Sequence, residues 1–225
     1  MSDLGKMARK GASASSARWL QRQRRDSWRR DAAREGYRSR AAYKLLEIDR
    51  RFGFLRRGAR VVDLGAAPGG WSQAAARRIG AAAGREWLVG VDVLEIAPVA
   101  GCRFLQRAFP APELQGEIRA LLQRVDVVLS DMLANVSGRR LVDHERSLAL
   151  CQAAEVFAAE MLSPGGALCC KLLRGGDGTE EQQMLADWQT RFKQVARFKP
   201  KASRGESAEI YLVATGFAKA SPTRA

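Results

Sequence analysis

The sequence predicts an α/β fold in which a seven-stranded, mostly parallel sheet is covered by helices on both faces. From residue 60 onward, short β-branched runs alternate with segments of helical length, a pattern typical of strand–helix–strand units. The last two runs are joined by residues 199–208, which are too few for a crossover helix, so we expect these two strands to pair antiparallel. With 225 residues and 46% hydrophobic content, the chain suits one compact domain.

The individual elements follow from local composition. Strands are expected where apolar residues gather in short runs, at 60–64, 87–92, 103–106, 125–130, 167–173, 194–198 and 210–214. Helices should fill the intervals at 70–80, 113–123, 143–161 and 179–190. An earlier helix should begin near Ser39, because Ala41, Leu45 and Ile48 are spaced to form one buried stripe; Gly53 then breaks the chain.

The net charge of +14 is concentrated at the two ends of the chain. Residues 1–40 hold twelve Lys and Arg against four Asp and Glu, residues 190–225 hold eight against two, and residues 41–189 are balanced. We therefore divide the chain into a flexible basic arm (1–37) that orders mainly on its ligand, a catalytic domain (38–217) and a short tail (218–225). Excess charge of this kind favours RNA or DNA phosphate as the partner, with a generally basic soluble surface as the alternative.

Nothing in the sequence predicts a membrane protein or a metal site. No stretch approaches the roughly 20 apolar residues of a membrane span, so we expect a soluble cytoplasmic monomer; an organelle transit peptide at the Arg- and Ser-rich start is the alternative. The four cysteines form no Cys-x-x-Cys pair, and His144 is the single histidine. Cys169 and Cys170 lie in an apolar run, where we expect small buried hydrophobic side chains.

A glycine-rich turn follows the first predicted strand. That strand contains Asp63, and Gly65, Gly69 and Gly70 come directly after it, where they let the backbone approach a ligand and turn into the next helix. Asp92 ends the second strand, at a position where an acid can accept hydrogen bonds from ribose hydroxyls. These features alone leave an adenosyl cofactor, a dinucleotide and a purely structural turn open.

Four charged residues occupy positions that a hydrophobic core would not select. Lys171 lies inside an apolar run typical of a central strand, where an unpaired ammonium is costly. Asp131 closes another apolar strand, and Glu209 opens the last one. Lys44 is on the helical face that carries Ala41, so it points partly toward the body of the domain. The alternative interpretation of these four residues is structural: a lysine that extends its amine to solvent, or an ordinary ion pair.

With these motifs the sequence resembles the FtsJ/RrmJ-type ribosomal RNA large-subunit 2′-O-ribose methyltransferases. The resemblance runs nearly end to end. Its most specific part is the turn Asp-Leu-Gly-Ala-Ala-Pro-Gly-Gly-Trp-Ser-Gln at 63–73, supported by Ser-Asp-Met at 130–132, Ser-Pro-Gly-Gly at 163–166 and Glu-Ile-Tyr-Leu-Val at 209–213. It implies a Rossmann-like methyltransferase domain that uses S-adenosylmethionine.

The resemblance also implies a set of site residues. The Lys-Asp-Lys-Glu catalytic set of the family falls on Lys44, Asp131, Lys171 and Glu209, with Glu206 a nearby alternative for the last member. The expected cofactor site consists of Asp63, Gly65, Gly69, Gly70, Trp71, Asp92 and Asp131. Two departures affect it: Ala108 stands where the family has an acid for the adenine, and Leu133-Ala134 replaces Ala-Pro after Met132.

On this interpretation Lys171 is the general base for a ribose 2′-hydroxyl, its pKa lowered by burial and by Lys44. Asp131 orients it, and Glu209 positions the lysines or the ribose. The implied substrate is large-subunit ribosomal RNA, with a uridine in the peptidyl-transferase region of an assembling subunit as target. The alternatives are a methyltransferase for transfer RNA or capped messenger RNA, a non-catalytic RNA-binding assembly factor, and an oxidoreductase, for which two such lysines have no role.

Overall fold

The computed structural model describes residues 27–203 and 207–218. Its helices are α2 (Ser27–Arg34), α3 (Ala41–Phe52), α4 (Gly70–Ile79), α5 (Leu114–Leu122), α6 (Arg140–Met161) and α7 (Thr179–Gln189). Its strands are β1 (Val61–Leu64), β2 (Leu88–Asp92), β3 (Cys102–Gln106), β4 (Val125–Ser130), β5 (Leu162–Leu173), β6 (Phe192–Phe198) and β7 (Glu209–Phe217). Each predicted strand and helix is present, with bounds shifted by a few residues.

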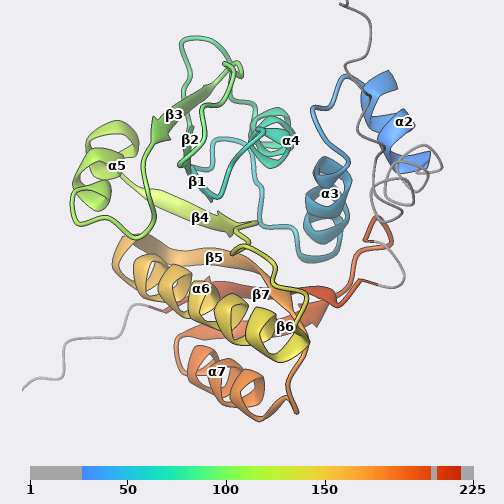
Figure 1. Ribbon diagram of the computed structural model, residues 1–225. Helices are drawn as coiled ribbons and strands as arrows, with labels where there is room; N and C mark the ends of the chain where they lie inside the picture. The colour runs from blue at the N-terminus through green and yellow to red at the C-terminus, as the bar shows by residue number, and fades with distance from the viewer. Residues whose placement is uncertain (1–26, 204–206, 219–225) are drawn as a thin grey trace, which may run out of the picture.

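The seven strands form one sheet in the order β3-β2-β1-β4-β5-β7-β6 (Figure 1). Strands β1 to β5 pair in parallel, whereas β7 runs antiparallel to both β5 and β6. The predicted α/β class and the antiparallel final pair are confirmed. Because the strand order reverses at β1 and β4, the carboxyl ends of these two strands form the crevice in which open α/β sheets bind ligands.

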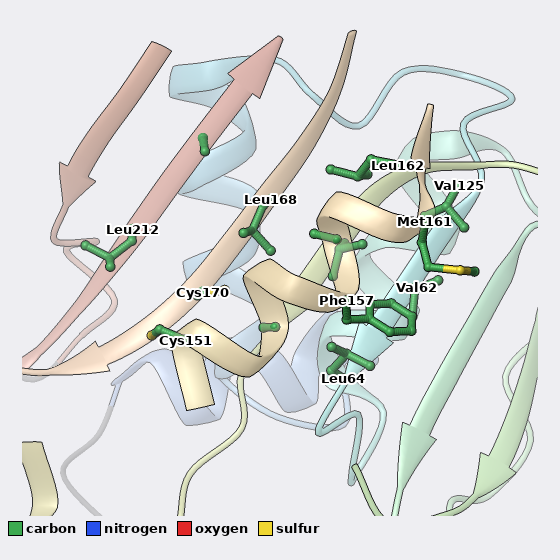
Figure 2. Packing of buried hydrophobic residues seen from close by; sticks show 14 of the residues in the cluster. Val62, Leu64, Val125, Cys151, Phe157, Met161, Leu162, Leu168, Cys170 and Leu212 are labelled. Atoms are coloured by element: carbon green, nitrogen blue, oxygen red, sulfur yellow. The ribbon is translucent and has the colours of Figure 1, made fainter. Parts of the chain in front are cut away.

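Helices cover both faces of the sheet, as predicted. Helices α3 and α4 pack on one face, around Leu45, Ile48 and Ile79. Helices α5, α6 and α7 pack on the other face, where Phe157 is part of the buried cluster (Figures 1 and 2). Trp188 of α7 belongs to the same cluster. The parallel strands between them are buried on both sides, which accounts for their near-continuous apolar runs. Cys151, Cys169 and Cys170 are buried in these cores, as expected for the pair in β5.

Two segments differ from the prediction. Residues 27–34, assigned to a ligand-ordered arm, form helix α2, whose Trp28 ring lies 5.2 Å from the ring of Tyr43 in α3; residues 1–26 lie outside the described part of the chain. Strand β5 begins at Leu162 and not at Ala167. Its pairing with β4 continues past Pro164 and the two glycines through a bulge, where the register shifts between Val125 and Val127 of β4. No helix in 27–203 or 207–218 is long and apolar enough to cross a membrane.

Candidate active site

The turn after β1 is in contact with the loop after β4. Gly65 has a left-handed backbone (φ +73°), and a Cβ at this position would lie 2.7 Å from Cγ of Met132 and 2.9 Å from the Met132 backbone nitrogen. Glycine is therefore what allows the two turns to touch. The contact places Asp131 at the end of β1, where its N–H donates to the Leu64 carbonyl at 3.2 Å.

The rest of the glycine turn packs against the segment that precedes α3. A Cβ on Gly69 (φ +99°) would lie 2.8 Å from Nη1 of Arg38, and one on Gly70 would collide with the Ser39 hydroxyl. The same Arg38 guanidinium donates to the Ala97 carbonyl at 2.5 Å, so it ties the turn after β1 to the loop after β2. Gly69 and Gly70 thus make room for protein atoms here, and neither lines the cavity described next.

A cavity of about 510 Å³ opens at the carboxyl ends of β1, β2 and β4. Its walls combine the Gly65 backbone with apolar side chains and two carboxylates, Asp92 and Asp131. Val93 and Leu94 line it and are 61% and 62% exposed, so apolar surface faces the open space. The volume is in the range of pockets for small organic ligands, and the mixture of apolar walls with a few fixed polar groups is typical of them.

Asp92 is held in place by backbone groups on both sides. Its Oδ2 accepts a hydrogen bond from the Ala67 N–H, and its Oδ1 accepts one from the Leu94 N–H, each at 2.9 Å. A carboxylate has about four acceptor positions, so two remain for ligand hydroxyls. The residues present therefore fit an adenosyl group: apolar surface for a base, an oriented acid for ribose hydroxyls, and negative charge for a cationic sulfur.

The structure bears on how an adenine ring would be recognised. Ala108 is exposed and does not line the cavity, whereas its neighbours Arg107 and Phe109 do. Arg107 is paired with Glu117 of α5 at 3.3 Å, and its backbone N–H donates to the Asp92 carbonyl at 2.9 Å. The wall after β3 thus offers an aromatic ring and a guanidinium in place of the family's acid.

Lys171 and Asp131 form a buried pair at the adjacent ends of β5 and β4. The Lys171 Nζ atom lies 3.1 Å from Oδ1 of Asp131 and also donates to the Asp131 backbone carbonyl. The lysine side chain is 7% exposed, which confirms that an amine lies buried within the apolar strand. Asp131 also lines the cavity, so one residue connects the cavity with the buried amine.

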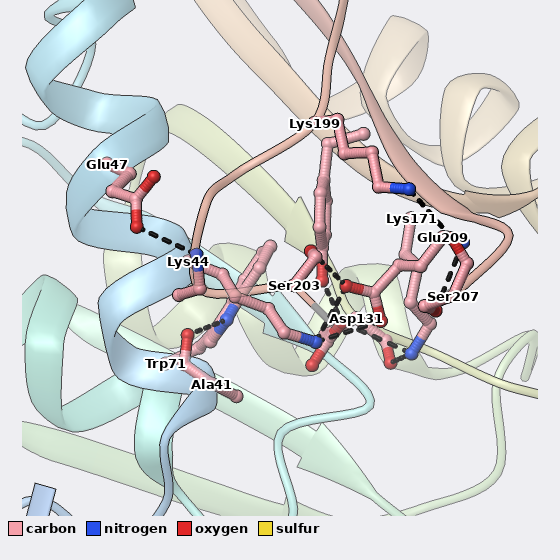
Figure 3. A network of polar contacts seen from close by, with 12 residues as sticks. Ala41, Lys44, Glu47, Trp71, Asp131, Lys171, Lys199, Ser203, Ser207 and Glu209 are labelled. Carbon is pink, nitrogen blue, oxygen red and sulfur yellow. Dashed lines mark hydrogen bonds and ion pairs between the residues drawn. The ribbon is translucent and has the colours of Figure 1, made fainter. Parts of the chain in front are cut away.

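Lys44 and Glu209 form the second pair, between α3 and the start of β7 (Figure 3). The Lys44 Nζ atom lies 2.7 and 2.8 Å from the two carboxylate oxygens, and both side chains are mostly buried. Burial by itself would raise the pKa of Glu209, but the Lys44 ammonium and the Ser203 hydroxyl, which donates to Oε1 at 2.7 Å, hold that pKa below its usual value. Glu209 is therefore ionised at neutral pH.

Tyr211 connects the two pairs, and sequence reasoning missed it. Its hydroxyl donates to Oδ1 of Asp131 at 3.0 Å, and its ring lies 6.0 Å from the Lys44 Nζ atom. Burial, with the nearby charges of Asp131 and Glu209, raises the pKa of Tyr211 well above its ordinary value, so the hydroxyl remains a donor. A tyrosine within an apolar strand run looks like a core residue; the signal was its place two residues after Glu209, on the same face.

Besides Gly69 and Gly70, two more predicted cofactor residues, Asp63 and Trp71, lie away from the cavity. Asp63 is fully buried beneath α4, where its Oδ2 accepts from the Ser72 hydroxyl at 2.6 Å; Oδ1 has no hydrogen-bond partner among the described residues. Burial raises the pKa of Asp63 to about 7. Trp71 stacks against Tyr211 with ring centroids 5.4 Å apart, and its Nε1–H donates to the Ala41 carbonyl at 2.8 Å. Of the expected cofactor site, Gly65, Asp92 and Asp131 line the cavity.

The sequence matches the family model described as FtsJ-like methyltransferase over residues 37–217, which includes every strand of the sheet and the whole of the site above. The chain belongs to the FtsJ-like methyltransferase family. Membership and the Rossmann-like fold imply S-adenosylmethionine as the methyl donor, in agreement with the chemistry of the cavity.

Relatives of this FtsJ-like methyltransferase carry a more specific name. "Ribosomal RNA large subunit methyltransferase E" of Azorhizobium caulinodans is 49% identical over 206 residues, which are 91% of this chain and 85% of the relative. The protein of that name from Parvibaculum lavamentivorans is 49% identical over 220 residues, which are 94% of this chain and 85% of the relative. Among solved structures, a Plasmodium falciparum protein described as a ribosomal RNA methyltransferase aligns with a TM-score of 0.68 at 27% identity, over 80% of this chain and 98% of its own.

The two parts of the site of this FtsJ-like methyltransferase share one edge of the sheet. The cavity lies at the ends of β1, β2 and β4, and the two lysine–carboxylate pairs lie at the ends of β4 and β5 and the start of β7. An amine and a carboxylate beside a cofactor cavity can accept a proton and orient a polar substrate group. The arrangement is suited to transferring a methyl group to a hydroxyl oxygen.

Proposed function

We propose that this enzyme transfers the methyl group of S-adenosylmethionine to a ribose 2′-hydroxyl of large-subunit ribosomal RNA in the cytoplasm. The observation that carries the proposal is that Asp131 belongs both to the cavity wall and to the buried pair with Lys171. The relatives at 45–49% identity support the RNA substrate by their names. We include in the proposal a uridine in the peptidyl-transferase region of the assembling subunit as the target.

Asp92 would accept hydrogen bonds from the ribose of the cofactor, and Val93, Leu94 and Phe109 would supply an apolar surface for its base. When bound there, the cofactor would supply a methyl group on a cationic sulfur, and transfer of that methyl group to the hydroxyl oxygen would leave the sulfur as a neutral thioether. Asp131 has one carboxylate oxygen engaged by Lys171 and Tyr211, so it is held at the boundary between cofactor and substrate. Gly65 belongs to the same wall through its backbone.

Lys171 is the group proposed to take the proton. The 2′-hydroxyl is a weak nucleophile, so its proton must leave as the oxygen–carbon bond forms. In its deprotonated form the Lys171 amine accepts this proton at Nζ, and the Asp131 carboxylate, 3.1 Å away, stabilises the resulting ammonium. The Lys44 ammonium is fixed by Glu209 in a two-oxygen contact, and in this proposal it attracts the ribose and phosphate oxygens of the substrate.

The replacement Lys171→Met tests the base assignment, because it preserves most of the buried volume and removes the amine. We expect turnover to fall by about 10² to 10⁴, while S-adenosylmethionine affinity, measured by calorimetry, stays within a factor of about three. Lys193→Met, which changes an exposed lysine on β6, is the matched control and should be active. Wild-type turnover in Lys171→Met would refute the assignment.

The substrate is tested with labelled S-adenosylmethionine and separate pools of large ribosomal subunits, ribosomal RNA, transfer RNA and capped RNA. We expect the label in large-subunit RNA, at one ribose, and mapping of the alkali-resistant linkage identifies the nucleotide. Exclusive labelling of transfer RNA or of a cap would contradict the proposed substrate while leaving the reaction type intact. Label in no pool, from a protein that binds the cofactor, would contradict the enzymatic proposal.

A further inference from the structure

A second groove, of about 670 Å³, lies next to the lysine–carboxylate pairs on the α6 side of the sheet edge. Arg140, Arg174 and Lys199 line it together with the Gly175–Gly176 backbone, and none of its lining residues in 27–203 or 207–218 is a carboxylate. Its walls also include Ala208 and Ile210, the two neighbours of Glu209 in the chain. Figure 3 shows Lys199 and Ser207 beside Glu209. The groove therefore lies directly beside Glu209, one of the proposed catalytic residues.

The backbone at the groove is fixed by hydrogen bonds from both sides. His144 and Ser147 of α6 are buried and both bind the last residue of β5: His144 Nδ1 donates to the Leu173 carbonyl at 2.7 Å, and the Ser147 Oγ accepts from the Leu173 N–H at 3.0 Å. The next N–H, that of Arg174, donates to the Ala208 carbonyl at 3.0 Å. The point from which the Arg174 side chain extends is thus held by both α6 and the start of β7.

Two glycines form the floor of the groove and pack directly on the first turns of α6. A Cβ on Gly175 would collide with the Arg140 carbonyl, and one on Gly176 would lie 2.8 Å from Cδ2 of His144. No side chain could be placed at these positions without moving α6. The floor of the groove is therefore backbone that carries no side chain.

The guanidinium groups of Arg140 and Arg174 at this floor have no carboxylate partner in the described part of the chain. Within residues 27–203 and 207–218, neither Arg140 nor Arg174 forms a salt bridge or a side-chain hydrogen bond, and both are exposed. The Lys199 Nζ atom donates a hydrogen bond to the Ser207 carbonyl at 2.9 Å. Two guanidinium groups beside a fixed backbone floor are suited to a phosphodiester, since guanidinium groups bind phosphate oxygens in pairs.

We infer that this groove binds a backbone phosphate of the substrate RNA strand close to the methylated nucleotide, and so sets which ribose enters the site. The inference rests on the proposed function, because it takes RNA as the substrate. The phosphate is bound by Arg140 and Arg174, and the strand crosses the sheet edge from the α6 side toward Lys44. A contact to the backbone alone fixes position along the strand without reading the base.

The first experiment measures RNA affinity by fluorescence anisotropy, without cofactor, for the wild type, the double variant Arg140→Ala/Arg174→Ala, and Arg85→Ala. Arg85 is exposed and precedes β2, at the opposite edge of the sheet. Its replacement by Ala is therefore a control that removes one positive charge away from the groove, against two charges removed in the double variant. We expect about tenfold weaker binding for the double variant and a salt slope lower by roughly 1 to 2, because each lost phosphate contact lowers it by about 0.7 to 0.9. Arg85→Ala should change neither quantity; equal losses in both proteins would overturn the inference.

The second experiment locates the phosphate with RNA substrates that carry one uncharged methylphosphonate at successive positions around the target. At one position within about two nucleotides of the target, the wild type should lose about tenfold in affinity, and the double variant should lose little more, because the contact is already absent. Losses that add at every position would overturn the inference. If the wild type methylates RNA and the double variant has unchanged affinity and slope, this inference fails alone; a wild type that methylates no RNA refutes the proposed function.

Discussion

Asp63 should make the stability of this protein depend on pH in a way that one substitution removes. Its carboxyl is fully buried, one oxygen has no partner in the described part of the chain, and its pKa is raised from 3.8 to about 7, chiefly by burial. Since the folded-state pKa is the higher one, the stabilisation is fully present below about pH 4. It is lost as the pH rises to about 7, because the unfolded chain releases the proton first.

The size of the effect follows from the shift. Each unit of pKa difference corresponds to about 1.4 kcal/mol, so a shift of this size is worth on the order of 4 kcal/mol. In Asp63→Asn the residue is neutral at every pH and can still accept from the Ser72 hydroxyl. We therefore expect the variant's advantage in unfolding free energy to grow by about 1.4 kcal/mol per pH unit from pH 5 to pH 7 and to level off above that.

Urea unfolding of both proteins at pH 5, 6, 7, 8 and 9 measures this difference, and groups common to both proteins cancel. A difference that stays constant from pH 5 to pH 9 would refute the burial argument. The variant also tests the part that Asp63 plays in cofactor binding. Because Asp63 lies under α4 and not in the cavity, S-adenosylmethionine affinity at pH 6 should change by less than about threefold, and a loss of tenfold or more would show that it contacts the cofactor.

Three further substitutions test the site. Gly65→Ala should weaken S-adenosylmethionine binding at least about tenfold in calorimetry, because its Cβ would displace Met132; Gly53→Ala, also at positive φ but in open space, should not. Glu209→Gln leaves the buried Lys44 ammonium without its carboxylate, so urea unfolding should show a loss of about 3 kcal/mol, part of which Lys44→Met recovers in the double variant. Tyr211→Phe removes the hydroxyl bond to Asp131 and should lower kcat about tenfold, with KM for S-adenosylmethionine and Tm nearly unchanged.

The fold could be predicted because most of its strands are buried on both faces and read as continuous apolar runs. The same feature allowed Lys171 to be predicted as a site residue, because a lysine within a continuous apolar run has few structural explanations. Helix α2 could not be predicted in the same way, because Ala32 is its one buried residue and its position depends on contact between Trp28 and Tyr43. Tertiary contacts of this kind leave no periodic signal in the sequence.

Site residues were predicted well where a charged residue interrupts an apolar run. They were predicted less well where a polar residue lies in a polar segment of the sequence. Asp63 looked like a ligand contact because it precedes the glycine turn, yet alternation along β1 turns it to the α4 face, opposite to Val62 and Leu64. Arg38 and Ser203 are polar residues in polar segments, so nothing in the sequence distinguishes them. Their partners, the Ala97 carbonyl and Glu209, become adjacent only in the folded chain.

The reversed direction of β7 explains how the last member of the charged set reaches the others. In a parallel sheet the carboxyl ends of all strands share one edge, and the residues that begin a strand lie at the opposite edge. Because β7 is antiparallel to β5, its first residue, Glu209, pairs with Leu173 at the end of β5. The alternation of side chains then places Glu209 and Tyr211 on the α3 face, where Lys44 lies, and Ile210 on the α6 face, where the basic groove begins. A slip of one residue in this pairing would exchange the two faces, so the register of β5 and β7 sets the proposed catalytic residues and the proposed phosphate groove together.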